Sequence, residues 1–164
     1  MVDNTLALSI LKSTSFEYKG ESIKGYEEKT KHKFEYSIIT HKGDWRDANI
    51  PRLALEYHNP LLAYKFTPSN NGKLLEEFSF LEISPRNVIV TAMYMENEKI
   101  FLRVNETSGK ESRVLIKINP LFKIKEAWLV NALGEKNEKL DVNRNTIIFD
   151  IKGFSLETIE ISLK

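Results

Sequence analysis

Residues 88–118 read VIVTAMYMENEKIFLRVNETSGKESRVLIKI, and this stretch decides the fold class. Side chains on a β-strand point alternately to the two faces of a sheet, so a half-buried strand carries an apolar residue at every second position. Two runs within 99–118 have this period, with the apolar set Ile100, Leu102, Val104, Val114, Ile116 and Ile118. The preceding run, Val88–Met95, is apolar on both faces, which predicts a central strand covered on both sides. Between them, Glu96-Asn97-Glu98 is typical of a hairpin turn.

The same period extends in both directions along the chain. It recurs in Thr5–Leu11, Phe34–Ile38, Ile147–Ile151 and Ile159–Leu163, with turn residues in Thr107–Lys110, Asn143–Asn145 and Lys152-Gly153. Runs of this length and spacing predict an all-β fold, an antiparallel β-sandwich. One short helix is expected over Pro51–His58, because proline suits a helix start and Asn59-Pro60 a helix end. The polar stretch Lys19–Lys33 is expected to be a loop.

Length, charge and cysteine content narrow the class of protein. The 164 residues suit one domain, residues 1–164. Their 24 basic and 23 acidic side chains leave a net charge of +1, so neither nucleic acid nor a membrane is expected as a partner. The chain has no cysteine, which excludes disulfides and thiolate chemistry. No signal-peptide pattern is apparent near Met1, and we expect a soluble, cytoplasmic protein.

Residues that could carry chemistry are few. The three histidines, His32, His41 and His58, do not have the spacing of metal ligands, so no metal site is expected in this chain. His58 is better explained as a cation at the C-terminus of the predicted helix. Trp45 and Trp128 could stack on a sugar ring, but core packing explains Trp128 better. Adjacent acidic residues such as Glu27-Glu28 point in opposite directions on a strand and cannot flank one glycosidic bond.

One segment is more specific. Residues 32–46, HKFEYSIITHKGDWR, resemble the H-x-F-x-Y-x-(hydrophobic)-x-P-H-x-G-D-W stretch of family 38 α-mannosidases, with Thr40 in place of the proline. Further pieces follow in the family's order. They are residues 5–13, 59–61, 79–81, 88–92, 102–109, 131–135 and 156–159. The resemblance therefore covers nearly the whole chain.

The resemblance implies a portion of a galactose-mutarotase-like supersandwich, and with it a function. Family 38 enzymes cleave α-mannosides with retention, using a catalytic aspartate and a divalent metal, usually zinc, in an α/β-barrel domain. None of those motifs can be placed here, so no catalytic residue is assigned. We therefore expect a non-catalytic C-terminal β domain of an α-mannosidase, either a fragment or a separately encoded subunit, with the catalytic domain as its partner. The alternative is an independent carbohydrate-binding module for mannose-containing glycans. Apolar surface left exposed would favour a homo-oligomer.

The most family-like loop holds the candidate site residues His41, Asp44, Trp45 and Arg46. In the structural interpretation, Gly43 takes positive φ, Asp44 caps the N–H groups that follow, Trp45 packs under the turn and His41 hydrogen-bonds locally. In the functional interpretation, which rests on the resemblance, the loop faces the mannose cleft or the catalytic domain. His41 and Asp44 then hydrogen-bond substrate, and Trp45 forms an apolar wall.

Overall fold

The computed structural model describes residues 7–11, 16–23, 31–67, 72 and 75–164, and the chain divides into two compact units, Met1–Thr40 and His41–Lys164. In the first unit, strands β1 (Phe16–Tyr18) and β2 (Glu21–Ile23) form an antiparallel hairpin. Its turn, Lys19-Gly20, has positive φ at both residues. The predicted loop over Lys19–Lys33 is therefore wrong at β2, where three residues pair with β1, and residues 24–30 of it lie outside the described chain.

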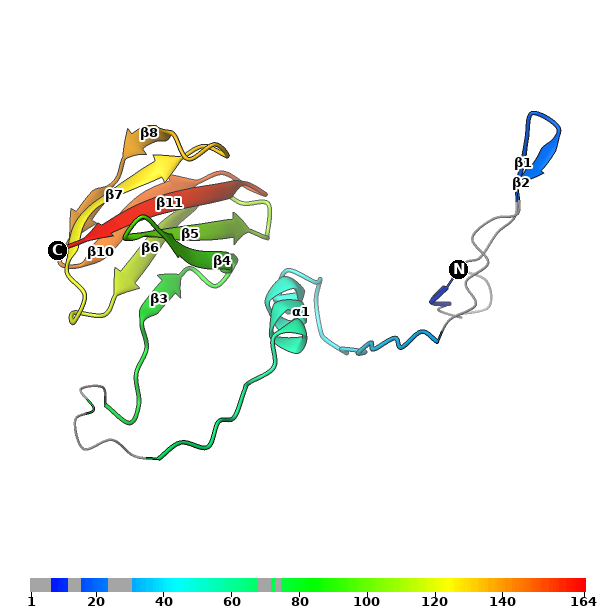
Figure 1. Cartoon of the computed structure of the whole chain (residues 1–164), viewed down its shortest axis with the longest axis horizontal. Helices are drawn as coiled ribbons and strands as arrows, with labels where there is room; N and C mark the ends of the chain where they lie inside the picture. Colours follow the sequence, from blue (N-terminus) through cyan, green and yellow to red (C-terminus); the bar gives the residue numbers. More distant parts are fainter. Residues whose placement is uncertain (1–6, 12–15, 24–30, 68–71, 73–74) are drawn as a thin grey trace. The chain divides into compact units, whose positions relative to one another are not determined.

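The second unit contains a helix followed by two antiparallel sheets (Figure 1). Its elements are α1 (Ile50–His58), β3 (Leu81–Ser84), β4 (Val88–Glu96), β5 (Lys99–Glu106), β6 (Ser112–Ile118), β7 (Ile124–Val130), β8 (Lys136–Lys139), β9 (Asp141–Asn143), β10 (Thr146–Ile151) and β11 (Leu156–Leu163). The four-stranded sheet has the order β3-β6-β10-β9, and the five-stranded sheet has the order β4-β5-β11-β7-β8. The structure confirms the predicted all-β sandwich with a short helix.

One apolar core joins the two sheets. The five-stranded sheet contributes Leu102 and Val104 from β5 with Ile159 and Ile161 from β11. The four-stranded sheet contributes alternate residues of β6 and β10, namely Val114, Ile116, Ile118, Ile147, Phe149 and Ile151. These are the apolar positions of the period-two runs, so the alternation read from the sequence is the alternation that builds the core. Burial of each such side chain stabilises the fold by about 1.5–3 kcal/mol.

The predicted turns have the geometry that their residues favour. Asn97-Glu98 joins β4 to β5 and Arg144-Asn145 joins β9 to β10, each pair with positive φ at both positions. Two-residue turns of this kind match the twist of paired strands. In contrast, residues 107–111 and 152–155 connect strands of different sheets, so they cross from one layer to the other.

The predicted helix is confirmed. α1 begins at Ile50, with Pro51 in its first turn, and ends at His58. The side-chain amide of Asn59 donates to the Leu55 carbonyl oxygen at 2.8 Å, which satisfies an acceptor left open at the helix end. His58 lies in the last turn, where a cation is favoured by the helix dipole.

The prediction of a central, doubly covered strand over Val88–Met95 is wrong. β4 lies at one edge of its sheet and is paired with β5. Val88 and Ile89 are buried, whereas Met93 is 53% and Met95 74% exposed. Apolar residues on both faces show that a strand needs covering, but they do not say which polypeptide covers it.

The strand predicted over Phe34–Ile38 is also wrong, because residues 31–40 have no regular secondary structure. Tyr36 and Ile38 are exposed, the latter by 83%. The strand predicted over Thr5–Leu11 is likewise not formed in 7–11, and Thr5 and Leu6 lie outside the described residues. A strand requires a neighbour for its backbone hydrogen bonds, and the described residues supply none to these segments. The assignment of residues 1–164 to a single β-sandwich domain stays a prediction.

Candidate functional site

The loop His41–Arg46 forms a compact turn that leads into α1. Asp44 Oδ1 accepts hydrogen bonds from the backbone N–H groups of Arg46, at 2.7 Å, and Asp47, at 3.1 Å. In return, the Asp44 N–H donates to Asp47 Oδ2 at 3.1 Å. Gly43 has a φ of 74°, which favours glycine. The predicted capping by Asp44 and the turn at Gly43 are confirmed.

Electrostatics stabilise the same turn. The hydrogen bond from the Asp47 backbone, together with those from Arg46, holds the pKa of Asp44 below its ordinary value. The Arg46 guanidinium pairs with Asp44 Oδ2 at 2.9 Å and lies 4.3 Å from the centre of the Trp45 ring. Trp45 is 37% exposed, so part of the indole faces solvent. His41 is exposed, and in the described residues its imidazole makes no hydrogen bond, contrary to the predicted local one.

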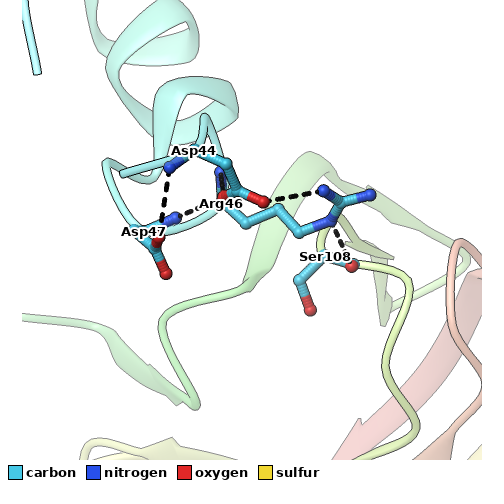
Figure 2. A network of polar contacts seen from close by, with 4 residues as sticks. All are labelled: Asp44, Arg46, Asp47 and Ser108. Atoms are coloured by element: carbon cyan, nitrogen blue, oxygen red, sulfur yellow. Dashed lines mark hydrogen bonds and ion pairs between the residues drawn. The ribbon is translucent and has the colours of Figure 1, made fainter. Parts of the chain in front are cut away.

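Arg46 attaches this turn to the sandwich. Its Nε donates to the carbonyl oxygen of Ser108, at 3.0 Å, across 62 positions of sequence (Figure 2). One guanidinium therefore bridges the Asp44 carboxylate and the connection between β5 and β6. The planar fork of arginine suits such a bridge, because its donors point in fixed and different directions.

A buried carboxylate holds the segment that receives Arg46. Glu106, the last residue of β5, is fully buried, and its two oxygens accept five hydrogen bonds. The donors are Asn87 Nδ2, Ser108 N, Ser108 Oγ, Gly109 N and Phe154 N, at 2.5–2.9 Å. Glu106 thus joins the start of β4, the turn after β5 and the turn before β11.

The hydrogen bonds determine the charge state of Glu106. Burial raises the pKa of Glu106, but the bonds from the Ser108 hydroxyl, the Phe154 N–H and the Asn87 amide outweigh burial and lower it to about 2. The carboxylate is therefore ionised at neutral pH although none of the described residues places an opposite charge in contact with it, since backbone and side-chain dipoles can stabilise a carboxylate in this way.

Two glycines let the turns around Glu106 approach each other. A Cβ at Gly153 would overlap the carbonyl group of Gly109, so the two backbones are in direct contact. Gly109 also has a φ of 77° and lies under the Phe154 ring. The sequence predicts turns at Thr107–Lys110 and Lys152-Gly153, but the role of Glu106 was not predicted. The available signal was its position, because Glu106 follows Leu102 and Val104 on the face that enters the core.

An open hollow of about 390 Å³ lies beside the Arg46 contact. Its lining includes Arg46, Asp47, Asn87, Ser108, Ser112 and Arg113. These side chains carry hydrogen-bond donors and acceptors of both charge signs. Such a lining suits a ligand rich in hydroxyl groups.

The other tryptophan has a different environment. Trp128 lies on β7 and is half-buried, with the ammonium groups of Lys136 and Lys139 at 4.7 and 5.7 Å from its ring centre. It lies opposite Glu160 of β11, which is buried and paired with Lys99 and Lys136, each at 3.1 Å. Lysine cations over the ring fill the place where a sugar would stack. Ala127 is fully buried in the core, whereas Trp128 is only half-buried and is not a core residue, so the predicted core packing of Trp128 is wrong.

Two further properties concern metals and membranes. Within the described ranges, no group of three or more His, Asp or Glu side chains could hold a metal ion. No helix in the part of the chain that the structure describes is long and apolar enough to cross a membrane.

Comparison with known proteins gives one family. Residues 87–164 match the C-terminal β-sandwich domain of glycosyl hydrolases family 38. No curated protein matches the chain. The match confirms the resemblance found in the sequence for the part of the chain from β4 to β11, which includes every residue of the Glu106 network. The His41–Arg46 loop lies before the matched residues.

Proposed function

Since residues 87–164 match the C-terminal β-sandwich domain of family 38 glycosyl hydrolases, we propose that this chain is the non-catalytic C-terminal β portion of an α-mannosidase. It supports the catalytic domain, and its His41–Arg46 loop lines the α-mannoside cleft. A C-terminal domain of this family implies a catalytic family 38 domain as its partner. The zinc ion and the catalytic aspartate that the resemblance implies then belong to that partner.

The observation that carries this proposal is a pair of exposed apolar segments. Residues 31–40 and 59–67 have no regular secondary structure. Their large apolar side chains are exposed, namely Phe34, Tyr36, Ile38, Ile39, Leu61, Leu62, Tyr64 and Phe66. Each segment by itself exposes several large apolar side chains, and exposed apolar surface of this kind marks an interaction site. A larger enzyme supplies the missing neighbours.

The loop offers the groups that a sugar substrate requires. Asp44 and Arg46 are held in place by each other and by Ser108, while His41 and one part of Trp45 remain accessible. A carboxylate and a guanidinium bind vicinal hydroxyl groups, and an indole packs on the apolar face of a pyranose. Under this proposal these residues bind and orient substrate, and the partner performs the bond cleavage. We propose the cytoplasm as the compartment, because the chain contains no cysteine.

The test is reconstitution. The chain and the catalytic portion of the same α-mannosidase are expressed separately, and hydrolysis of a nitrophenyl α-mannoside is measured for each and for the mixture. We expect no hydrolysis by the chain alone and a large gain on mixing. Full activity of the catalytic portion without the chain, and no association between them, would count against the supporting role.

Two substitutions then separate folding from substrate binding. Trp45→Ala and Asp44→Ala in the reconstituted enzyme are compared with Leu133→Ala, a change at another exposed loop residue. A rise in KM or a fall in kcat at unchanged thermal stability supports the cleft role. Unchanged kinetics in the molecules that remain folded would leave the loop with a structural role.

The hollow beside Arg46 favours a second candidate, an independent carbohydrate-binding module. Its volume of about 390 Å³ and its hydrogen-bonding lining suit a monosaccharide or disaccharide. Calorimetric titration of the isolated chain with methyl α-mannoside and α-mannobiose tests this candidate. Saturable binding that Asp47→Asn weakens would favour the module.

A further inference from the structure

The four-stranded and the five-stranded sheet have four edges between them, and one of these edges differs from the others. The five-stranded sheet ends at β8, whose sequence is Lys-Asn-Glu-Lys, and the four-stranded sheet ends at the short strands β3 and β9, of four and three residues. Short and charged edges are the usual means by which proteins prevent further strand pairing. The remaining edge, β4, has nine residues and no charged side chain from Val88 to Met95.

A groove follows this edge. One hollow of about 350 Å³ is lined by Val90–Met93 of β4 and by Leu55, Glu56 and Asn59 of α1. A second hollow of about 220 Å³ is lined by Phe80, Met93, Tyr94, Met95 and Ile100. The two hollows share Met93, so together they extend along β4 from Val90 to Met95. Every side chain that β4 contributes to this groove is uncharged.

We propose that this groove binds one extended, uncharged, apolar segment of the rest of the α-mannosidase polypeptide as an additional β-strand beside β4. The identification of that polypeptide as an α-mannosidase rests on the proposed function. The added strand pairs with the N–H and C=O groups of β4 on the side away from β5, as in other cases of strand addition to an exposed edge. Its side chains cover Met93, Tyr94 and Met95.

The shape of the groove selects this occupant. Leu55, Glu56 and Asn59 of α1 line the hollow opposite Val90–Met93, so a strand added beside this part of β4 would lie next to α1. A second copy that paired through its own β4 would bring β5 and the rest of its sheet into the space of α1. Charge gives the second criterion, because the hollow beside Met93, Tyr94 and Met95 has no charged residue in its lining, and a charged side chain placed there would lose its hydration without gaining an opposite charge. With an added strand, β4 would become an interior strand of its sheet and would no longer present an unpaired edge.

The experiment measures binding of the full chain to the catalytic portion of the same enzyme. Met93→Lys and Met95→Lys place an ammonium in the groove, and both side chains are exposed enough for the fold to tolerate the change. Met95→Leu keeps the apolar character, and Leu133→Lys is the matched control at an exposed apolar residue outside the groove. We expect the two groove lysines to weaken the Kd at least tenfold, and the two controls to leave it unchanged.

Hydrogen exchange gives a second measurement. In the complex, the backbone amides of β4 that face away from β5 become protected, while those of β8 do not. This inference is overturned if the wild-type chain associates with the catalytic portion, the groove lysines do not weaken that association and β4 gains no protection. In that case the proposed function still stands. No association of the wild-type chain at all is evidence against the proposed function. Loss of a homodimer in the groove variants would assign the groove to a second copy and also overturn the inference.

Discussion

The sandwich strands and the segment 31–40 carry the same sequence pattern but have different structures. In β10, Ile147, Phe149 and Ile151 alternate with polar or partly buried residues, and Ile147 is fully buried. In residues 34–38 the same alternation leaves Tyr36 and Ile38 exposed, the latter by 83%. The difference lies in the neighbours, since β10 is paired with β6 and β9. The alternation of apolar and polar residues therefore indicates that a segment needs partner strands. These partner strands need not belong to the same chain.

The largest expected effect on the free energy of unfolding comes from making the same substitution, isoleucine to alanine, in each of the two regions. Ile147→Ala removes buried methylene groups from the core, and we expect a loss of about 3–4 kcal/mol in the free energy of unfolding. Ile38→Ala removes the same atoms from an exposed side chain, and we expect a change below about 0.5 kcal/mol. Urea unfolding measures both. Equal losses would show that residues 34–38 are packed in solution and would remove the contrast.

The second effect concerns acid stability. The pKa of Glu106 is lowered from 4.5 to about 2 in the folded chain. Because the folded value is the lower one, the stabilisation is fully present above pH 4.5 and is lost as pH falls through 4.5 toward 2. The shift corresponds to about 3 kcal/mol. Urea unfolding from pH 6 to pH 2 should therefore show a decline in stability whose size Glu106→Gln reduces.

The matched control for this measurement is Glu111→Gln, at an exposed residue of the following turn. It should keep the wild-type pH dependence. Glu106→Gln also turns an amide NH₂ toward N–H donors, so its stability at neutral pH should already be lower. An unchanged pH profile in Glu106→Gln would assign the acid sensitivity to other carboxylates.

The third effect is a steric one at the contact between turns. Gly153→Ala places a Cβ against the backbone of Gly109, which cannot move without disturbing the hydrogen bonds to Glu106. We expect a loss of about 2 kcal/mol by thermal unfolding. Gly134→Ala is the comparison, because it has a φ of 81° and no atom within 4 Å of the new Cβ. Its cost, about 1 kcal/mol, is backbone strain alone.

The smallest effect is expected at the attachment of the loop. Arg46→Ala removes the bond to Ser108 and the pair with Asp44, both at the surface, so we expect about 1 kcal/mol or less. Lys125→Ala, at an exposed residue of β7, should change stability less. Fluorescence of Trp45 should also change, because the guanidinium 4.3 Å from its ring is lost. A loss well above 1 kcal/mol would mean that the loop is part of the core structure.

Local features were predictable because short segments of chain decide them. The hairpin at Asn97-Glu98 follows from turn chemistry, α1 follows from the proline and Asn-Pro at its ends, and the Asp44 cap follows from a carboxylate two and three residues before free N–H groups. The alternation within β5, β6, β10 and β11 identified the core positions for the same reason. Each of these inferences needs only residues close in sequence.

Contacts between distant residues could not be read in this way. The bond from Arg46 to Ser108 joins positions 62 apart, and the Glu106 carboxylate gathers Asn87, Gly109 and Phe154 from three separate turns. The edge position of β4 depends on the order of strands in the sheet, which alternation does not encode. Amino-acid sequence specifies which face of a strand must be covered, because burial is a property of side chains. Tertiary structure decides what covers it, because pairing and sheet order arise between segments that have no local relation to each other.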